Sequence, residues 1–490
     1  MRPFTSVLLA VVLASASAST GCGVGDKIYH CDSTHACQNG AQAGVCEPTG
    51  YCSFTDLGCV GVPRRYGSAA PDGIARFCVS ATGDAGLADA STGSDAGGDA
   101  TLTDAAPPDA MRDGAPIDAA PPGNCWSNLA AGPEHMCAWK NDGTYFCWGN
   151  PMNGRLGARQ PAGPGQPVQG AAPPSPGSLS LGDEFTCGVA SDNDLWCAGG
   201  NGAGQLGDGT MTERATSFVK VRTSAAATLM GAQRVAAGFD HACTQISGTI
   251  YCWGNNDRGQ VGRDPAGLTS SLYAVPLTGV TGARGLQAGN HHNCYITDSP
   301  AAGSVWCFGR GIEGQLGTTT PADSFTPVRA GTLTGVTRLA LGAFGSCALN
   351  GSGEVYCWGK NTTGRFGVGD MANHPTPTKM LGLTVSITKI AVSDDSVCAI
   401  CTCGNVWCAG SNDRGRLGQP LATTMALMPM QIPAFDGAVD IAAGYHNACI
   451  TRTNGEIWCW GGNDAGELGR DPVAVAQSAT PLRLMGVSCP

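Results

Sequence analysis

The chain has 490 residues, including 73 glycines and 25 cysteines, and only 13% of its residues are charged. Gly at roughly twice its usual share predicts a chain rich in turns and excludes a helical bundle or an α/β enzyme of ordinary composition. The net charge of −10 argues against a nucleic-acid partner, because binding to phosphates requires clustered Lys and Arg.

Residues 1–21 have the pattern of an export signal: Arg2 precedes an apolar run, Val7 to Ala14, that is too short to span a bilayer. Ser19-Thr20-Gly21-Cys22 resembles a bacterial lipoprotein signal, in which the Cys is lipidated and becomes the new N-terminus. Lipidation of Cys22 would leave 24 of the 25 cysteines, an even number, for pairing. We expect an exported lipoprotein of the cell envelope, anchored in the outer membrane and facing outward. The alternative is a secreted protein cut after Ala18.

Residues 22–82 are predicted to form the lipidated N-terminus and a small disulfide-rich module. A core this small needs covalent cross-links, and six cysteines fall within about fifty residues. Their spacing lacks the close pairs of a zinc module, and the sequence leaves their pairing open. They are Cys31, Cys37, Cys46, Cys52, Cys59 and Cys78.

Residues 83–123 are predicted to be a disordered linker. Ala, Asp, Gly and Pro dominate this segment, and Arg112 is its only basic residue. Low hydrophobicity and self-repulsion keep such a segment extended and solvated.

Residues 124–490 contain a sevenfold repeat. A Cys-Trp-Gly segment or a relative of it recurs every 50 to 55 residues, and each copy continues into a nine-residue motif that begins and ends with Gly, as from Gly254 to Gly262. The first Gly of each motif is Gly149, Gly199, Gly254, Gly309, Gly359, Gly410 or Gly461.

Each repeat has the periodicity of β-strands, as in Glu354-Val355-Tyr356-Cys357-Trp358. In one copy we predict strands at 336–342, 346–350, 354–358 and 376–381. Four-stranded units repeated seven times describe an all-β fold, a seven-bladed β-propeller. The alternative is the kelch type of propeller repeat, whose Gly-Gly doublet occurs only at Gly199-Gly200 and Gly461-Gly462.

The segment Ala237-Gly238-Phe239-Asp240-His241-Ala242-Cys243, followed by Tyr251-Cys252-Trp253-Gly254, resembles the repeat of the regulator of chromosome condensation. The Cys-bearing form of this repeat is similar to the repeats of exported lipoproteins from bacteria such as the myxobacteria. The resemblance implies a ring whose faces bind another protein. In that family the eukaryotic namesake exchanges guanine nucleotides on a GTPase, and a bacterial relative inhibits β-lactamases.

The hairpin turns predict a disulfide in every blade. Counting outward from the three-residue loop Asn141-Asp142-Gly143 sets Cys137 directly opposite Cys147. Cys125 and Cys489 stand outside the repeats and are predicted to bond to each other, which leaves Cys401 and Cys403 to pair locally. The other predicted pairs are Cys187 with Cys197, Cys243 with Cys252, Cys294 with Cys307, Cys347 with Cys357, Cys398 with Cys408, and Cys449 with Cys459.

The histidines offer little support for catalysis. His135, His241 and His292 occupy one repeat position, but the other copies place Phe185, Gly345, Ser396 and Asn447 there, which favours a structural role. A mixed His/carboxylate site at one mouth of the channel is the alternative. Its residues would be His291, His446, Asp183, Glu184, Asp240, Asp394 and Asp395.

The favoured function is that of a surface-displayed, lipid-anchored propeller that binds an unidentified protein or envelope polymer through its loops, with no catalysis, cofactor or metal. We expect this propeller to be a monomer. Alternatives are an enzyme acting on a polysaccharide or lactone, and nucleotide exchange by family analogy. The copies differ at 158–177, 263–273, 297–304 and 419–430, so these segments are predicted to carry specificity. Leu268, Leu272 and Tyr273 are predicted to be exposed anchors.

Overall fold

The computed structural model describes residues 125–157, 165–170, 176–212, 214–433, 435–487 and 489, together with the backbone of five short strands near the N-terminus. The predictions for the signal, for lipidation of Cys22 and for the linker at 83–123 lie outside the described residues. The five strands belong to a separate unit, Gly23–Met111. They are β1 (Gln38–Asn39), β2 (Gln42–Ala43), β3 (Val45–Cys46), β4 (Cys52–Thr55) and β5 (Arg64–Tyr66).

The N-terminal strands form two antiparallel sheets, β1-β2 and β3-β4-β5. The register of β3 and β4 sets Cys46 opposite Cys52. The pairing of the six cysteines in this module stays open, because the described part of the module is its strand backbone.

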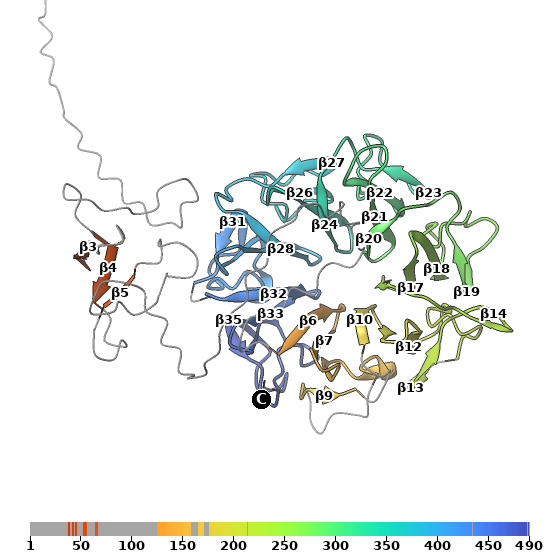
Figure 1. The fold of residues 1–490 in the computed structure, drawn as a ribbon, viewed down its shortest axis with the longest axis horizontal. Helices are drawn as coiled ribbons and strands as arrows, with labels where there is room; N and C mark the ends of the chain where they lie inside the picture. The colour runs from red at the N-terminus through yellow and green to blue at the C-terminus, as the bar shows by residue number, and fades with distance from the viewer. Residues whose placement is uncertain are drawn as a thin grey trace, which may run out of the picture. The chain divides into compact units, whose positions relative to one another are not determined.

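From Trp126 onward the chain forms seven four-stranded antiparallel sheets arranged as blades around an axis (Figure 1). Blades 1 to 3 consist of β6 (Trp126–Ala131), β7 (His135–Lys140), β8 (Tyr145–Gly149) and β9 (Val168–Gln169); β10 (Pro176–Leu181), β11 (Phe185–Ala190), β12 (Leu195–Gly199) and β13 (Arg214–Lys220); and β16 (Arg234–Ala237), β17 (His241–Ile246), β18 (Thr249–Asn255) and β19 (Ser270–Pro276).

Blades 4 to 7 repeat this order. They consist of β20 (Arg284–Ala288), β21 (His292–Thr297), β22 (Ser304–Gly309) and β23 (Ser324–Arg329); β24 (Val336–Leu341), β25 (Gly345–Asn350), β26 (Val355–Gly359) and β27 (His374–Lys379); β28 (Ile387–Val392), β29 (Ser396–Cys401), β30 (Val406–Ser411) and β31 (Met425–Gln431); and β32 (Ala438–Ala443), β33 (Asn447–Arg452), β34 (Ile457–Gly462) and β35 (Gln477–Arg483).

The all-β, seven-bladed fold predicted from the sequence is confirmed, and the strand bounds in the fifth repeat agree to within two residues. The sequence analysis missed the two-stranded ribbon of β14 (Arg222–Ser224) and β15 (Ala227–Thr228) after blade 2. It also missed two 3-10 turns, η1 (Met152–Gly154) and η2 (Asp413–Gly415). In the described part of the chain, no helix is long and apolar enough to cross a membrane.

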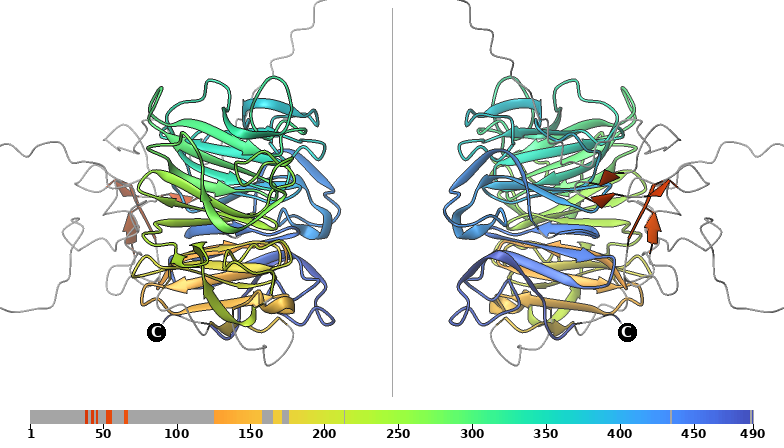
Figure 2. Two further views of the ribbon diagram at one scale, coloured as in Figure 1. Left: turned by 90° about the vertical axis from the view of Figure 1, so that its right-hand side faces the viewer. Right: turned by 90° about the vertical axis from the view of Figure 1, so that its left-hand side faces the viewer.

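The first strand of each blade faces the axis, where it contacts the first strands of the neighbouring blades. Side views show the sheets of neighbouring blades packed against one another around the ring (Figure 2). The ring closes where β6 meets β32, and no blade borrows a strand from the other end of the chain. A disulfide between Cys125 and Cys489 joins the two ends there, across a sequence separation of 364 residues.

Each blade contains a cross-strand disulfide between its second and third strands. Cys137 lies opposite Cys147 in register, and Cys243 lies opposite Cys252 although its hairpin is one residue shorter. The two Cα atoms are 4.1 Å apart in all seven pairs, close to the spacing of a non-hydrogen-bonded antiparallel pair. Gly143 has φ = +83°, the left-handed conformation that a three-residue loop requires at this position.

The core consists of clusters between neighbouring blades. The residue that follows the third-strand Cys points into the preceding blade, so Trp358 of blade 5 packs with Leu316 and Ala330 of blade 4. Its indole Nε1 donates a hydrogen bond to the carbonyl oxygen of Gln315, 2.9 Å away. Trp148, Trp253 and Trp460 make the same contact with Glu467, Gln205 and Arg416.

Candidate binding face

One face of the propeller carries two sets of connections. In an antiparallel blade, the turn between the first and second strands and the loop between the third and fourth strands lie at the same edge. We call this side the mouth face, because its inner turns surround one end of the central channel. The hairpins between the second and third strands lie on the opposite side, which we call the hairpin face.

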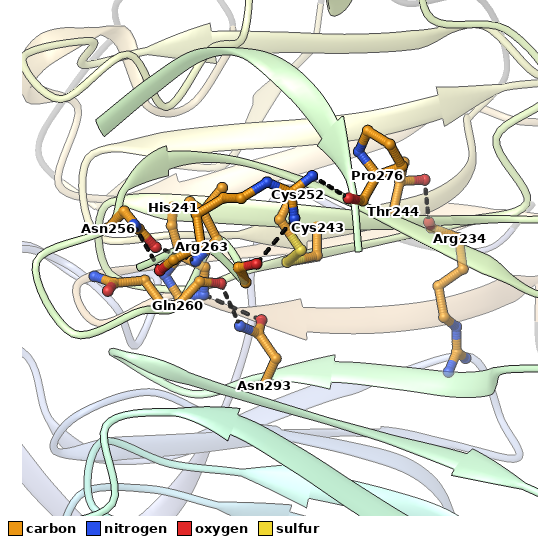
Figure 3. Close-up of a disulfide and its surroundings, with 12 residues drawn as sticks. Arg234, His241, Cys243, Thr244, Cys252, Asn256, Gln260, Arg263, Pro276 and Asn293 are labelled. Carbon is orange, nitrogen blue, oxygen red and sulfur yellow. Dashed lines mark hydrogen bonds between the residues drawn. A yellow bond between two sulfur atoms is a disulfide. The ribbon is translucent and has the colours of Figure 1, made fainter. Parts of the chain in front are cut away.

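The three histidines of the repeat motif join neighbouring blades on the mouth face. His241 is fully buried, and its Nε2 lies 3.1 Å from Oδ1 of Asn293 in blade 4 (Figure 3). The amide of Asn293 in turn donates to the carbonyl oxygen of Gln260 in blade 3. His135 and His292 bond in the same way to Thr186 and Ser346 of the next blade.

These bonds indicate which ring nitrogen of each histidine carries a hydrogen. Oδ1 of Asn293 can only accept, so Nε2 of His241 carries the hydrogen and Nδ1 is a buried acceptor without a partner. Gly238 is required beside this ring, since a Cβ there would lie 2.1 Å from Cε1 of His241. The geometry therefore supports a structural role for the motif histidine, as expected from the sequence.

Acid is expected to destabilise the fold through His241. Burial lowers its pKa to about 4, below the ordinary value of about 6.5. Because the unfolded chain then binds the proton more tightly, the free energy of unfolding should fall by on the order of 2 kcal/mol as the pH drops from about 6.5 to about 4. His241→Phe, which Phe185 shows to fit in blade 2, removes this dependence. Denaturant unfolding of both proteins at several pH values measures it.

The parent-minus-variant difference is the informative quantity, because other groups titrate in this range with the opposite sign. Burial raises the pKa of Asp183 and of Asp394 to about 6, so these carboxyl groups favour the folded state as they are protonated. If the difference in unfolding free energy between parent and variant stays constant from pH 7 to pH 4.5, the acid destabilisation is not due to His241.

A buried Asn organises the loop between the third and fourth strands. In blade 3, Oδ1 of Asn256 accepts from the backbone N–H of Val261, and its amide donates to the carbonyl oxygens of Arg263 and Leu268 (Figure 3 shows the bond to Arg263). Equivalent side chains hold the loops of four other blades: Asn201, Asn361, Asn412 and Asn463.

The inner turns close over the channel. Backbone hydrogen bonds link one turn to the next, as from Asp183 to Phe239 and from Phe239 to Asn290. Across the mouth, the amide of Asn290 in blade 4 donates to the hydroxyl of Tyr445 in blade 7 at 3.1 Å. The cavity that these turns line has a volume of about 80 Å³, far below the roughly 300 Å³ at which small-molecule sites begin. The channel mouth is therefore narrower than a typical small-molecule pocket.

The structure places the predicted His/carboxylate residues on this face, but pairs several of them with arginines. Arg155 lies 3.2 Å from Glu134 and 3.7 Å from Glu184 of the next blade. Nδ1 of His291 is 3.9 Å from the Asp240 carboxylate. The other partners are Arg416, which bonds to Nδ1 of His446 and lies 3.6 Å from Asp395, and Arg365, 3.9 Å from Asp395.

These arginines were not predicted from the sequence, although the repeat alignment contains a signal for them. Three repeats replace the motif Gln with Arg155, Arg365 or Arg416, and blade 7 carries Glu467 there. Burial raises the pKa of Glu467 to about 7. The arginines bring opposite charges close together across neighbouring blades, although the buried guanidinium of Arg365 makes no hydrogen bond. Among the described residues no three His, Cys, Asp or Glu side chains gather as a metal site.

The predicted anchors are not exposed. Leu268, Leu272 and Tyr273 are each half-buried. Leu272 lies over Gly204 and Tyr273 over Gly209, two loop residues of blade 2, so close that a Cβ on either Gly would clash. The prediction of exposure is wrong because this segment fills the space between blades 2 and 3. Part of segment 158–177 lies outside the described residues.

Exposed apolar side chains occur instead on the fourth strand of blade 6 and in the segments before and after the fourth strand of blade 5. Met428 on β31 is 40% exposed, and positions next to it are occupied by Gly369 and Gly382 of blade 5. The stretch 417–435 contains no charged residue. We call this surface the methionine patch and define it by its exposed members: Met371, Leu381, Leu421, Met425, Met428 and Met430.

Comparison with known proteins agrees with the fold and its repeat. Two profiles of the regulator of chromosome condensation (RCC1) repeat match, one at residues 302–349 and 352–400, the other at 178–205, 233–260, 336–365 and 438–467. Among solved structures, Prp20p from Saccharomyces cerevisiae is 20% identical with a TM-score of 0.61, covering 74% of this chain and 88% of that one. Human WBSCR16 is 19% identical with a TM-score of 0.60, covering 69% and 93%.

The sequence relatives include one protein that is much longer than this chain and one of comparable length. The E3 ubiquitin-protein ligase HERC2 of Homo sapiens is 28% identical over 345 residues, which are 67% of this chain but only 7% of the relative. The ultraviolet-B receptor UVR8 of Arabidopsis thaliana is 24% identical over 366 residues, 70% of this chain and 78% of the relative.

The blades, their buried Trp and His contacts and the Asn-held loops define a repeat propeller of seven blades. The matching profiles identify repeats of the RCC1 type, rather than kelch repeats, in blades 2 to 7.

Proposed function

We propose that the chain is an exported, lipid-anchored binding protein whose propeller docks a protein partner without catalytic turnover of its own. The methionine patch is the observation that carries this proposal. Met side chains are flexible and polarizable, and they are over-represented on surfaces that bind protein partners. An uncharged exposed edge strand beside them is a ready surface for another chain.

The relatives support binding as the general role. The structural study of Prp20p concerns its binding to Gsp1p and histones, and a second structure holds it with Kap60. The closed channel mouth favours binding over the alternative of a polysaccharide- or lactone-processing enzyme. Nucleotide exchange stays a second alternative, by family analogy alone.

Charging the patch is expected to abolish capture of the partner. The variant is Met425→Glu/Met428→Glu, and the matched control is Met230→Glu, at a Met that is 69% exposed after the β14-β15 ribbon. Purified protein is used to capture partners from envelope extract. Partner bands retained by the parent and by the control should fall at least tenfold with the patch variant, at an unchanged thermal midpoint. Equal capture by all three proteins, or turnover of a polysaccharide by the parent, would refute the proposal.

A further inference from the structure

The hairpin of blade 6 carries a second disulfide beside the cross-strand one. Cys401 ends β29, and it bonds to Cys403 two residues later, within the turn. Cys403 is the exposed cysteine of the propeller: Cys125 and Cys489 are half-buried, and the other described propeller cysteines are buried. The blade disulfides are therefore buried, whereas Cys403 is an exposed residue on the hairpin face and its partner Cys401 is buried.

The turn does not need this bond. Blades 1, 2, 5 and 7 form the same three-residue turn without cysteines, with left-handed residues Gly143, Asn193, Gly353 and Gly455 at the position of Gly404. Backbone bonds close all of these turns in the same way, including Gly404 N–H to the Cys401 carbonyl and Gly143 N–H to that of Lys140.

In those blades a polar side chain takes the place of Cys403. Asp142 accepts a hydrogen bond from the backbone N–H of Thr144, and Asn454 accepts one from that of Glu456. In blade 6 the equivalent N–H, that of Asn405, points instead at Sγ of Cys401, 3.3 Å away. The disulfide has replaced an ordinary Asx turn, and its inner sulfur receives a backbone donor.

We propose that Cys401–Cys403 is a thiol–disulfide exchange site that oxidises a thiol substrate, with Cys403 as the attacked sulfur and Cys401 as the leaving group. A substrate thiolate attacks Sγ of Cys403 and forms a mixed disulfide, and the Cys401–Cys403 bond breaks with its electron pair on Cys401. The Asn405 N–H stabilises that thiolate, and an easily stabilised thiolate leaves faster.

A second thiol completes the reaction. It attacks the substrate sulfur of the mixed disulfide, so Cys403 leaves as a thiolate, and each cysteine takes up one of the protons that the two thiols release. Two substrate thiols become one disulfide, and the protein disulfide becomes two thiols. The remaining bonds of the hairpin, including the buried Cys398–Cys408 disulfide, keep blade 6 folded in both states.

The test measures which cysteines react first in the native full-length protein. The protein is incubated with reduced glutathione or with dithiothreitol as the dithiol probe, free thiols are trapped with N-ethylmaleimide, and fragment spectra locate the labels. We expect labels on Cys401 and Cys403 at least tenfold sooner than on Cys398 and Cys408, and a glutathione adduct on Cys403. Labelling of the two pairs at equal rates, or an adduct on Cys401 instead, would overturn the proposal.

The matched variant is Cys401→Ser/Cys403→Asn, which restores the Asn that blade 7 has at the second position. It should give no early labels in the propeller and keep the thermal midpoint of the parent within about 2 °C. A large fall in that midpoint would show that the bond is a structural staple, and would also overturn the proposal.

Discussion

Removing the disulfide that joins the two ends of the propeller is expected to cause the largest loss of stability of any single cross-link. In the loop-entropy account, the stabilisation grows with the number of residues enclosed, and Cys125–Cys489 encloses 364. We expect Cys125→Ser/Cys489→Ser to lower the free energy of unfolding by about 5 kcal/mol. The measurement is thermal and denaturant unfolding of the exported protein.

Without the disulfide, blades 1 and 7 are held to each other by non-covalent contacts alone, because no loop of the propeller connects them directly. Nε1 of Trp126 donates to the Gly455 carbonyl, and the backbone N–H of Leu129 donates to the buried Asp440 carboxylate. The first and last blades are therefore the pair that can separate when the Cys125–Cys489 disulfide is removed. The control is Cys401→Ser/Cys403→Asn, because that disulfide joins cysteines only two residues apart. We expect this control to change the free energy of unfolding very little. Equal thermal midpoints for Cys125→Ser/Cys489→Ser and the parent would contradict this prediction.

Sequence periodicity was sufficient for the fold because each motif residue serves the same contact in many copies. The motif His, Asn and Trp residues all form hydrogen bonds with loops or with neighbouring blades. Because these contacts recur in many blades, the residues that make them recur in the sequence. The hairpin register also follows from local turn chemistry, so opposition of Cys137 and Cys147 could be counted from Gly143.

The individual features of single blades could not be predicted in this way. Whether Leu272 and Tyr273 reach solvent depends on the loop of the preceding blade, where Gly204 and Gly209 leave room for them. Closure of the mouth depends on Asn290 and Tyr445, which lie 155 residues apart. Each of them is the only residue of its type at this turn position in the seven repeats. Such contacts leave no periodic trace in one sequence.

Trp358→Ala is expected to cost about 3 to 5 kcal/mol of unfolding free energy, the range for a large aromatic removed from a packed core. Trp358 is fully buried, and its ring fills the space between blades 4 and 5 beside Leu316 and Ala330. The substitution also removes the indole donor from the Gln315 carbonyl, although that oxygen keeps a bond from the Ser346 hydroxyl. Chemical denaturation of parent and variant measures the loss.

Two variants separate packing from hydrogen bonding. Trp358→Phe keeps most of the ring volume, and the fully buried Phe308 shows that blade 4 accepts Phe at this position, so the loss should be about 1 to 2 kcal/mol. Trp407→Ala truncates a half-buried Trp that directly precedes Cys408 on β30, and should also lower the free energy of unfolding by less than Trp358→Ala. If Trp407→Ala is as damaging as Trp358→Ala, the stability of the ring does not reside in the contacts that each blade makes with the one before it.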